Sequence, residues 1–255
     1  MKRTWQISNG IALLITIAIN YLSNTGIFDG NTVASISDRY QNYFTPAGYA
    51  FSIWGLIYVS LICFVIYQGR SLFSKTEKSN IVERIGWWFV ISCLANGLWI
   101  IAWLYQYTGL SVLIMALLLF SLMKIVVRTS NALDDVSSGE RAFVWWPFSL
   151  YSGWITVAFI ADMAAWLTKI KWAGFGISAV GWTVIMICAA GVINLFMTWK
   201  RNMRIFSLVG VWALTAIAVS NWNGQQSVVR TALIVAVVLL VSTGIHFQRR
   251  RRIHQ

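Results

Sequence analysis

Residues 85–123 read IGWWFVISCLANGLWIIAWLYQYTGLSVLIMALLLFSLM and contain no Lys, Arg, Asp or Glu. A helix that crosses the roughly 30 Å hydrocarbon core of a bilayer needs about 20 mainly apolar residues, so this stretch is long enough for two crossings. The short polar segment at 106–109, Gln-Tyr-Thr-Gly, predicts that two antiparallel helices meet there. This stretch therefore decides the fold class, an all-α integral membrane protein.

The rest of the chain repeats the pattern. Charge-free runs also occupy residues 4–28, 40–69, 142–161, 172–199, 205–229 and 231–248. Charged residues make up 11% of the chain, whereas a soluble domain has about 25%. We therefore expect about eight transmembrane helices, at residues 9–23, 46–67, 85–105, 110–127, 143–167, 172–198, 205–220 and 228–247.

The basic residues predict the orientation of these helices. With both termini in the cytoplasm, 16 of the 20 Lys and Arg residues, Lys75 and Lys78 among them, lie in cytoplasmic segments. The other side then holds four, Arg39, Lys169, Lys171 and Arg230. Cytoplasmic loops of membrane proteins are enriched in Lys and Arg, so we expect a multi-pass protein of the inner or plasma membrane with both termini inside.

The net charge of +12 is accounted for by this partition and does not indicate a nucleic-acid partner. The four arginines at 249–252 are typical of an anchor for lipid headgroups. The lipid bilayer is thus the first partner that the sequence predicts.

Three of the expected helices carry an aromatic stripe at helical spacing. The stripes consist of Phe51, Trp54 and Tyr58; of Asn96, Trp99 and Trp103; and of Tyr151, Trp154, Ala158 and Asp162. Residues spaced in this way lie along one face of a helix. Two interpretations are open: the rings line a cavity for a flat apolar ligand, or they only pack helix against helix.

Asp162 is the only acidic residue inside an expected span. A carboxylate at the centre of a membrane helix costs about 2.5–3.5 kcal/mol on insertion scales, and less near the interface. Three roles are open for it. It is a partly solvated residue near Lys169 and Lys171, a hydrogen-bonding group of a cavity, or the proton-carrying residue of a transporter.

Residues 44–58, FTPAGYAFSIWGLIY, resemble the second-helix signature of the tryptophan-rich sensory protein/translocator protein family (TspO/MBR). In that signature a proline at the start of the helix is followed by a Trp and a Tyr, here Pro46, Trp54 and Tyr58. Asn96-x-x-Trp99 and Tyr151-x-x-Trp154-x-x-x-Ala158 resemble the motifs of the third and fifth helices. The resemblance covers about residues 1–168. Thr45 and Ser52 stand where the family has prolines, and Asp162 where it has Asn.

The resemblance implies a five-helix membrane domain at residues 1–168, with residues 169–255 as a three-helix extension that ends in a basic tail. It implies a cavity that takes a porphyrin, another tetrapyrrole or a sterol-like molecule, closed by the first outer loop at 24–45, and a possible homodimer. The expected ligand-binding residues are Pro46, Phe51, Trp54, Tyr58, Asn96, Trp99, Trp103, Tyr151, Trp154, Ala158 and Asp162.

These features favour a membrane receptor, sensor or translocator for a small hydrophobic planar ligand. The alternative is a proton-coupled secondary transporter of a small hydrophobic or amphipathic solute. The only histidines, His246 and His254, lie near the C-terminal end, and neither a Ser-His-Asp nor an HExxH arrangement is present. We therefore expect no catalytic residue, no metal site and no required cofactor. A porphyrin- or haem-like molecule is expected only as a ligand, and the resemblance leaves a porphyrin-degrading side activity open.

Overall fold

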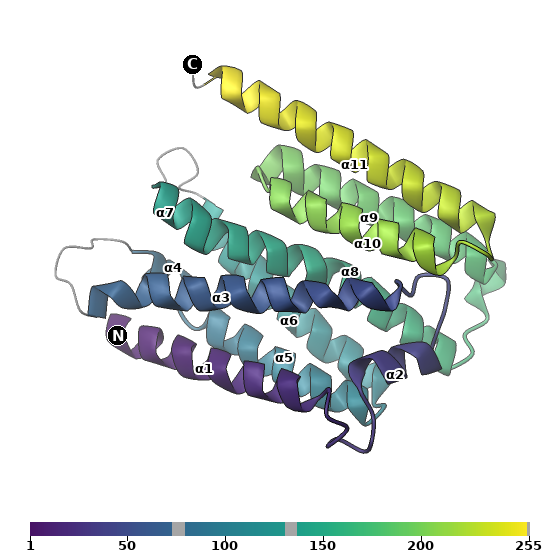
Figure 1. Ribbon diagram of the computed structural model, residues 1–255, viewed down its shortest axis with the longest axis horizontal. Coiled ribbons are helices and arrows are strands. Elements are labelled where there is room, and N and C mark those ends of the chain that lie inside the picture. Colours follow the sequence, from purple (N-terminus) through teal and green to yellow (C-terminus); the bar gives the residue numbers. More distant parts are fainter. Residues whose placement is uncertain (73–79, 131–136, 254–255) are drawn as a thin grey trace. The chain divides into compact units, whose positions relative to one another are not determined.

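The computed structural model describes residues 1–72, 80–130 and 137–253 (Figure 1). This part of the chain consists of helices and the turns between them, without a strand. The α-helices are α1 (Lys2–Leu22), α2 (Val33–Arg39), α3 (Ile53–Gly69), α4 (Ile81–Ile85), α5 (Trp88–Leu104), α6 (Thr108–Ser130), α7 (Ser138–Glu140), α8 (Trp146–Lys169), α9 (Ala179–Arg201), α10 (Arg204–Ser220) and α11 (Gln226–Ile253). Shorter 3-10 and π turns, η1 (Gly48–Ser52), η2 (Arg70–Leu72), η3 (Arg141–Trp145) and η4 (Gly174–Gly176), lie between them.

All eight expected membrane helices are present. Six helical stretches among the described residues are long and apolar enough to cross a membrane, namely Lys2–Leu22, Gly48–Leu72, Thr108–Thr129, Ser138–Lys169, Ala179–Arg201 and Gln226–Arg249. The other two, α5 and α10, are apolar helices of 17 residues. At 1.5 Å per residue, 17 residues extend about 26 Å, which is the lower end of the range for a crossing. The fold class, an all-α multi-pass membrane protein, is confirmed.

The orientation in the membrane stays a prediction. Lys75 and Lys78, which count toward the predicted partition of basic residues, lie outside the described residues. The arginines at 249–252 belong to the last turns of α11, so the final helix runs past the end of the expected span at 247.

Two helix starts differ from the expectation. Pro46 does not begin the second span, because η1 starts at Gly48 and α3 at Ile53. The sixth span was expected from residue 172, but α9 begins at Ala179. Gly174, Phe175 and Gly176 all have positive φ values of 71°, 51° and 84°, a conformation that cannot continue a right-handed helix.

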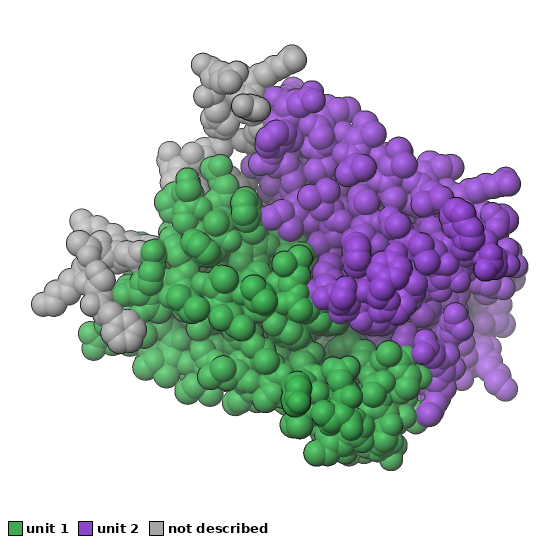
Figure 2. Space-filling view, in the orientation of Figure 1, with its two compact units in different colours: residues 1–36, 54–152 green, residues 37–53, 153–255 purple. Residues whose placement is uncertain are grey.

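The chain divides into two compact units (Figure 2). Unit 1 consists of Met1–Ile36 and Trp54–Ser152, and unit 2 of Ser37–Ile53 and Gly153–Gln255. The border between the units falls inside α8 and not near residue 168. The expected separation into a five-helix domain and a three-helix extension stays a prediction.

Unit 1 has an aromatic core and a polar network near its first helix. The rings of Phe64, Phe89 and Phe148 contact one another with centroids 4.9–5.8 Å apart. Gln68 accepts a hydrogen bond at 2.9 Å from the amide of Asn9, which is fully buried. Polar side chains inside a membrane bundle are commonly paired in this way between helices.

Unit 2 is built on α9, α10 and α11, which pack against one another. The segment after α2 is tied to α10 by three hydrogen bonds: Asn221 Nδ2 donates to Tyr43 O at 3.0 Å, Ala47 N to Ala216 O at 3.0 Å, and Trp212 Nε1 to Ala50 O at 3.2 Å. These bonds satisfy backbone groups outside regular helices, which have no water to bond in a hydrocarbon environment.

Candidate functional site

Four rings of unit 1 form a stacked series that we call the aromatic column: Tyr58, Trp54, Trp99 and Trp103. Successive centroids are 5.6, 6.4 and 6.2 Å apart, with interplanar angles of 20°, 25° and 21°. Such distances are typical of offset-stacked aromatic pairs. The column arises because α3 and α5 each place two rings four residues apart on one face. The predicted stripes of these helices therefore face each other.

Hydrogen bonds connect the column to α1 and α8. Asn20 Nδ2 donates to Asn96 Oδ1 at 2.8 Å, and Asn96 Nδ2 donates to the Tyr151 hydroxyl at 2.9 Å. The ring of Tyr151 lies edge-on to Trp54 at 6.0 Å. Asn96 and Tyr151 are buried. The two hydrogen bonds therefore connect α1, α5 and α8 around the column.

The rings of the column differ in how much of their surface is accessible. Trp99 and Trp103 are buried, whereas Trp54 and Tyr58 on α3 are half-buried. The hydroxyl oxygen of Tyr58 is buried near Asn96 but has no partner of good hydrogen-bond geometry among the described residues. A buried polar atom of this kind calls for an explanation, such as a water or a ligand.

The loop at residues 24–45, the predicted first outer loop, contacts one end of the column. Trp103 Nε1 donates to Val33 O at 3.2 Å, and Asn31 Nδ2 donates to Leu104 O at 3.0 Å. Thr32 and Ser35 cap the start of α2 reciprocally, with backbone-to-side-chain bonds of 2.9 and 3.1 Å. The loop is thus ordered and held at the end of α5. That it closes a cavity stays a prediction.

The remaining predicted residues lie in unit 2. Phe51 and Trp154 meet edge-on at 6.1 Å, and Pro46 is buried and Ala158 half-buried. Asp162 is only 3% exposed, which does not fit a solvated residue beside Lys169 and Lys171. The structure therefore gathers Trp54, Tyr58, Asn96, Trp99, Trp103 and Tyr151 in unit 1, and pairs Phe51 with Trp154 in unit 2.

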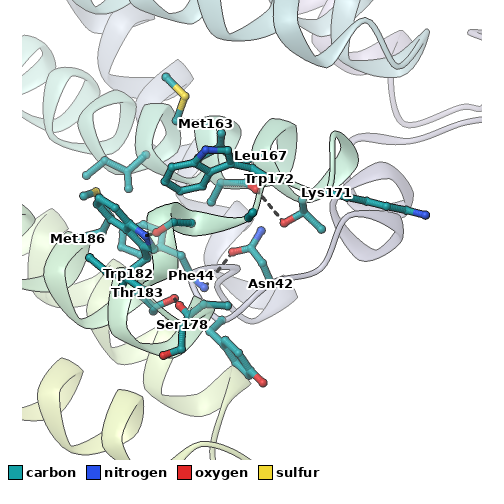
Figure 3. A pocket seen from close by; sticks show the side chains of 18 of the residues that line it. Asn42, Phe44, Met163, Leu167, Lys171, Trp172, Ser178, Trp182, Thr183 and Met186 are labelled. Carbon is teal, nitrogen blue, oxygen red and sulfur yellow. Dashed lines mark hydrogen bonds between the residues drawn. The ribbon is translucent and has the colours of Figure 1, made fainter.

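Unit 2 also contains a cavity of about 630 Å³ that the sequence did not indicate (Figure 3). Its walls come from residues 42–44, the second half of α8, the turn at 171–174 and the beginning of α9. None of the eleven predicted residues lines it. Among the residues that the structure describes, no group of three or more His, Cys, Asp or Glu side chains is arranged to hold a metal ion.

No curated protein and no solved structure matches the chain. A family model with the description "TSPO-like protein" matches residues 6–245. The match continues past residue 168, where the motifs in the sequence end, through α9, α10 and most of α11. The chain belongs to the TSPO-like protein family.

Proposed function

We propose that this protein is a membrane sensor or translocator that binds a planar hydrophobic ligand, a porphyrin-like tetrapyrrole or a sterol-like molecule, against the aromatic column. The observation that carries the proposal is the stack of four rings that joins α3 to α5. Membership of a family of sensor- and translocator-type membrane proteins supports it. A flat apolar ligand gains most from parallel ring faces, because offset stacking adds about 0.5–1.5 kcal/mol per pair beyond burial.

The accessible part of the column defines how the ligand would approach. Trp54 and Tyr58 retain exposed surface, so the ligand would lie against the α3 side while Trp99 and Trp103 support those rings from behind. A polar edge of the ligand that entered between α3 and α5 would accept a hydrogen bond from the Tyr58 hydroxyl, which is buried near Asn96. Ligand pockets combine apolar walls with a few such polar groups.

The test is a titration of the purified full-length protein with protoporphyrin IX and with a sterol. Binding is followed by porphyrin absorbance, since removing a tryptophan changes the fluorescence of the protein itself. Trp54→Ala should weaken binding by a few-fold to about tenfold, the loss expected for one stacked ring.

Trp199→Ala is the matched control for this titration. Trp199 donates its Nε1 hydrogen to Ser242 Oγ at 2.8 Å and precedes Lys200 and Arg201, as an interfacial anchor does. Its removal should leave porphyrin affinity unchanged. Equal affinity of wild type and Trp54→Ala would show that the aromatic column is not the binding site.

Asp162 supports a second candidate function, a proton-coupled transporter. Its side chain is buried within α8, and ionisable residues inside membrane helices commonly mark transport pathways. Asp162→Asn keeps hydrogen-bonding capacity and cannot exchange a proton. Unchanged binding with loss of liposome flux would favour the transporter, whereas unchanged binding and flux would favour the sensor or a passive translocator.

A further inference from the structure

The second half of α8 presents two separate faces. Trp154, Ala158 and Asp162 follow one line along the helix, and Phe159 and Met163 follow another with Leu167. With 3.6 residues per turn, the two lines are about 140° apart around the helix axis. The cavity of unit 2 is lined by the second line and not by the first. The cavity is therefore separate from the face of α8 that carries Trp154, Ala158 and Asp162.

The cavity is large and its walls are mainly apolar. Its volume of about 630 Å³ is within the range of about 300–1,000 Å³ typical of small-molecule sites. Trp172 and Trp182 stand in its wall with centroids 5.3 Å apart, tilted by 50° (Figure 3). Met163 and Met186 also line it, and methionine side chains adapt to ligands of irregular shape.

Three polar side chains of the wall donate their hydrogen bonds to backbone carbonyls. Trp182 Nε1 donates to Gly174 O at 2.8 Å, Thr183 Oγ1 to Ala179 O at 2.8 Å, and Thr168 Oγ1 to Ala164 O at 2.8 Å. A ligand therefore gains no new hydrogen bond from these donors. A polar group placed inside would lose its contacts with water without replacement, which is costly. The wall therefore favours a ligand whose inserted part is hydrocarbon.

The cavity is also elongated. Its α8 wall extends from Phe159 to Thr168, and at 1.5 Å rise per residue this wall is about 14 Å long. The α9 wall extends from Ile177, just before the helix, to Met186. An elongated apolar space between two helices suits an aliphatic chain.

Positive charge lies at the rim. Lys171 contributes to the wall, but its side chain extends outward from the cavity (Figure 3). Lys169 is close by in sequence, with its amino group 5.7 Å from the centre of the Tyr40 ring. By the predicted topology these are two of only four basic residues on the outer side. A ligand with a hydrocarbon body inside and an anionic end at this rim matches both features.

We propose that the cavity between α8 and α9 binds an aliphatic chain that ends in an anionic group, with the chain among the tryptophan and methionine side chains and the anion beside Lys171. A free fatty acid and the acyl chain of an anionic phospholipid share this chemistry. The site is independent of the ligand proposed for the aromatic column.

The probe is cis-parinaric acid, a fluorescent fatty acid, titrated into the full-length protein in phosphatidylcholine nanodiscs. Wild type should bind it saturably. Ala164→Phe places a ring in the cavity and should weaken binding by about tenfold or more, since crowding of a filled site costs that much. Ala179→Phe, at an exposed position of the opposite wall, should also weaken binding. With this second variant the test does not depend on the folding of Ala164→Phe alone.

Ala189→Phe is the matched control. Ala189 is half-buried on α9 and lies outside the cavity wall, so its replacement should leave the affinity for parinarate unchanged. Lys171→Glu should weaken binding several-fold at low salt and less at high salt, because exposed charges are screened. The methyl ester of parinarate should bind more weakly than the acid.

Nanodiscs with added phosphatidylglycerol identify the source of the chain. A raised apparent Kd for parinarate means that the lipid competes for the site, and an unchanged Kd means that a free fatty acid is preferred. Both results support the proposal. No saturable binding by wild type, wild-type affinity in a folded Ala164→Phe, or equal affinity for acid and methyl ester would overturn it.

Discussion

The aromatic column of unit 1 and the cavity of unit 2 use the same kind of side chain and differ in how the rings are arranged. In the column, rings are held by other rings: Trp99 stacks on Trp54 and on Trp103. In the cavity, Trp172 and Trp182 meet at a tilt of 50°, and Gly174 O accepts a hydrogen bond from the Trp182 indole at 2.8 Å. Rings stacked nearly in parallel fill the space between helices, whereas the tilted pair lies in the wall of an open space.

The largest expected effect is a loss of stability, which should be greater for a ring of the column than for a ring of the cavity wall. Trp99→Ala should lower the free energy of unfolding by about 3 kcal/mol, the lower end for a buried Trp, because lipid removes much of the hydrophobic driving force between membrane helices. Trp172→Ala should cost only about 1 kcal/mol, since the half-buried ring loses mainly its contacts with Trp182 and Phe175. Denaturant titration in one detergent compares them, and equal losses would contradict the distinction.

The same contrast explains what the sequence could and could not predict. The column was predictable because the spacings Trp54–Tyr58 and Trp99–Trp103 set rings on one helix face, and the structure brings these faces together. Whether the rings would stack on each other or line a cavity was not encoded in the spacing, because that depends on the distance between helices.

The cavity could not be read from the sequence for a different reason. Residues 172–178 are free of charge, which predicts that they belong to a span, yet the positive φ values from Gly174 to Gly176 make them a turn. Ser178 then caps α9 by accepting a hydrogen bond from Gly181 N at 3.1 Å. Two glycines two residues apart followed by a serine are the local signal for a helix boundary. The contribution of residues 42–44 to the wall is tertiary and leaves no such signal.

A smaller effect concerns polar groups in the two regions. Asn96→Leu removes both hydrogen bonds between Asn20, Asn96 and Tyr151 and should destabilise the protein by about 1–2 kcal/mol, the size found for bonds between membrane helices. Thr183→Val, in the cavity wall, should be nearly neutral, because its hydroxyl bonds only the Ala179 carbonyl of its own helix. Thermal unfolding measures the stability of both variants. If Thr183→Val destabilises the protein as much as Asn96→Leu does, the Thr183 hydroxyl makes more than a bond within its own helix.

The smallest expected effect tests whether the first outer loop controls access to the column. Asn31→Ala removes the bond from Asn31 Nδ2 to Leu104 O, worth about 0.5–1.5 kcal/mol. If the loop must detach before a ligand leaves, the dissociation rate of protoporphyrin should rise a few-fold. Deletion of residues 32–37, which removes most of α2, should raise it further.

Thr25→Ala controls for changes in the loop that do not affect its attachment, because the Thr25 hydroxyl bonds only the nearby Leu22 carbonyl at 2.8 Å. Stopped-flow displacement gives the rates for all of these variants. The parinarate off-rate in unit 2, measured on the same proteins, shows whether the change is specific to the column. Protoporphyrin release at the wild-type rate from a folded Asn31→Ala protein, and from the deletion, would mean that the loop is an ordered connection and not a lid. The open α3 side of the column would then be the route by which the ligand enters and leaves.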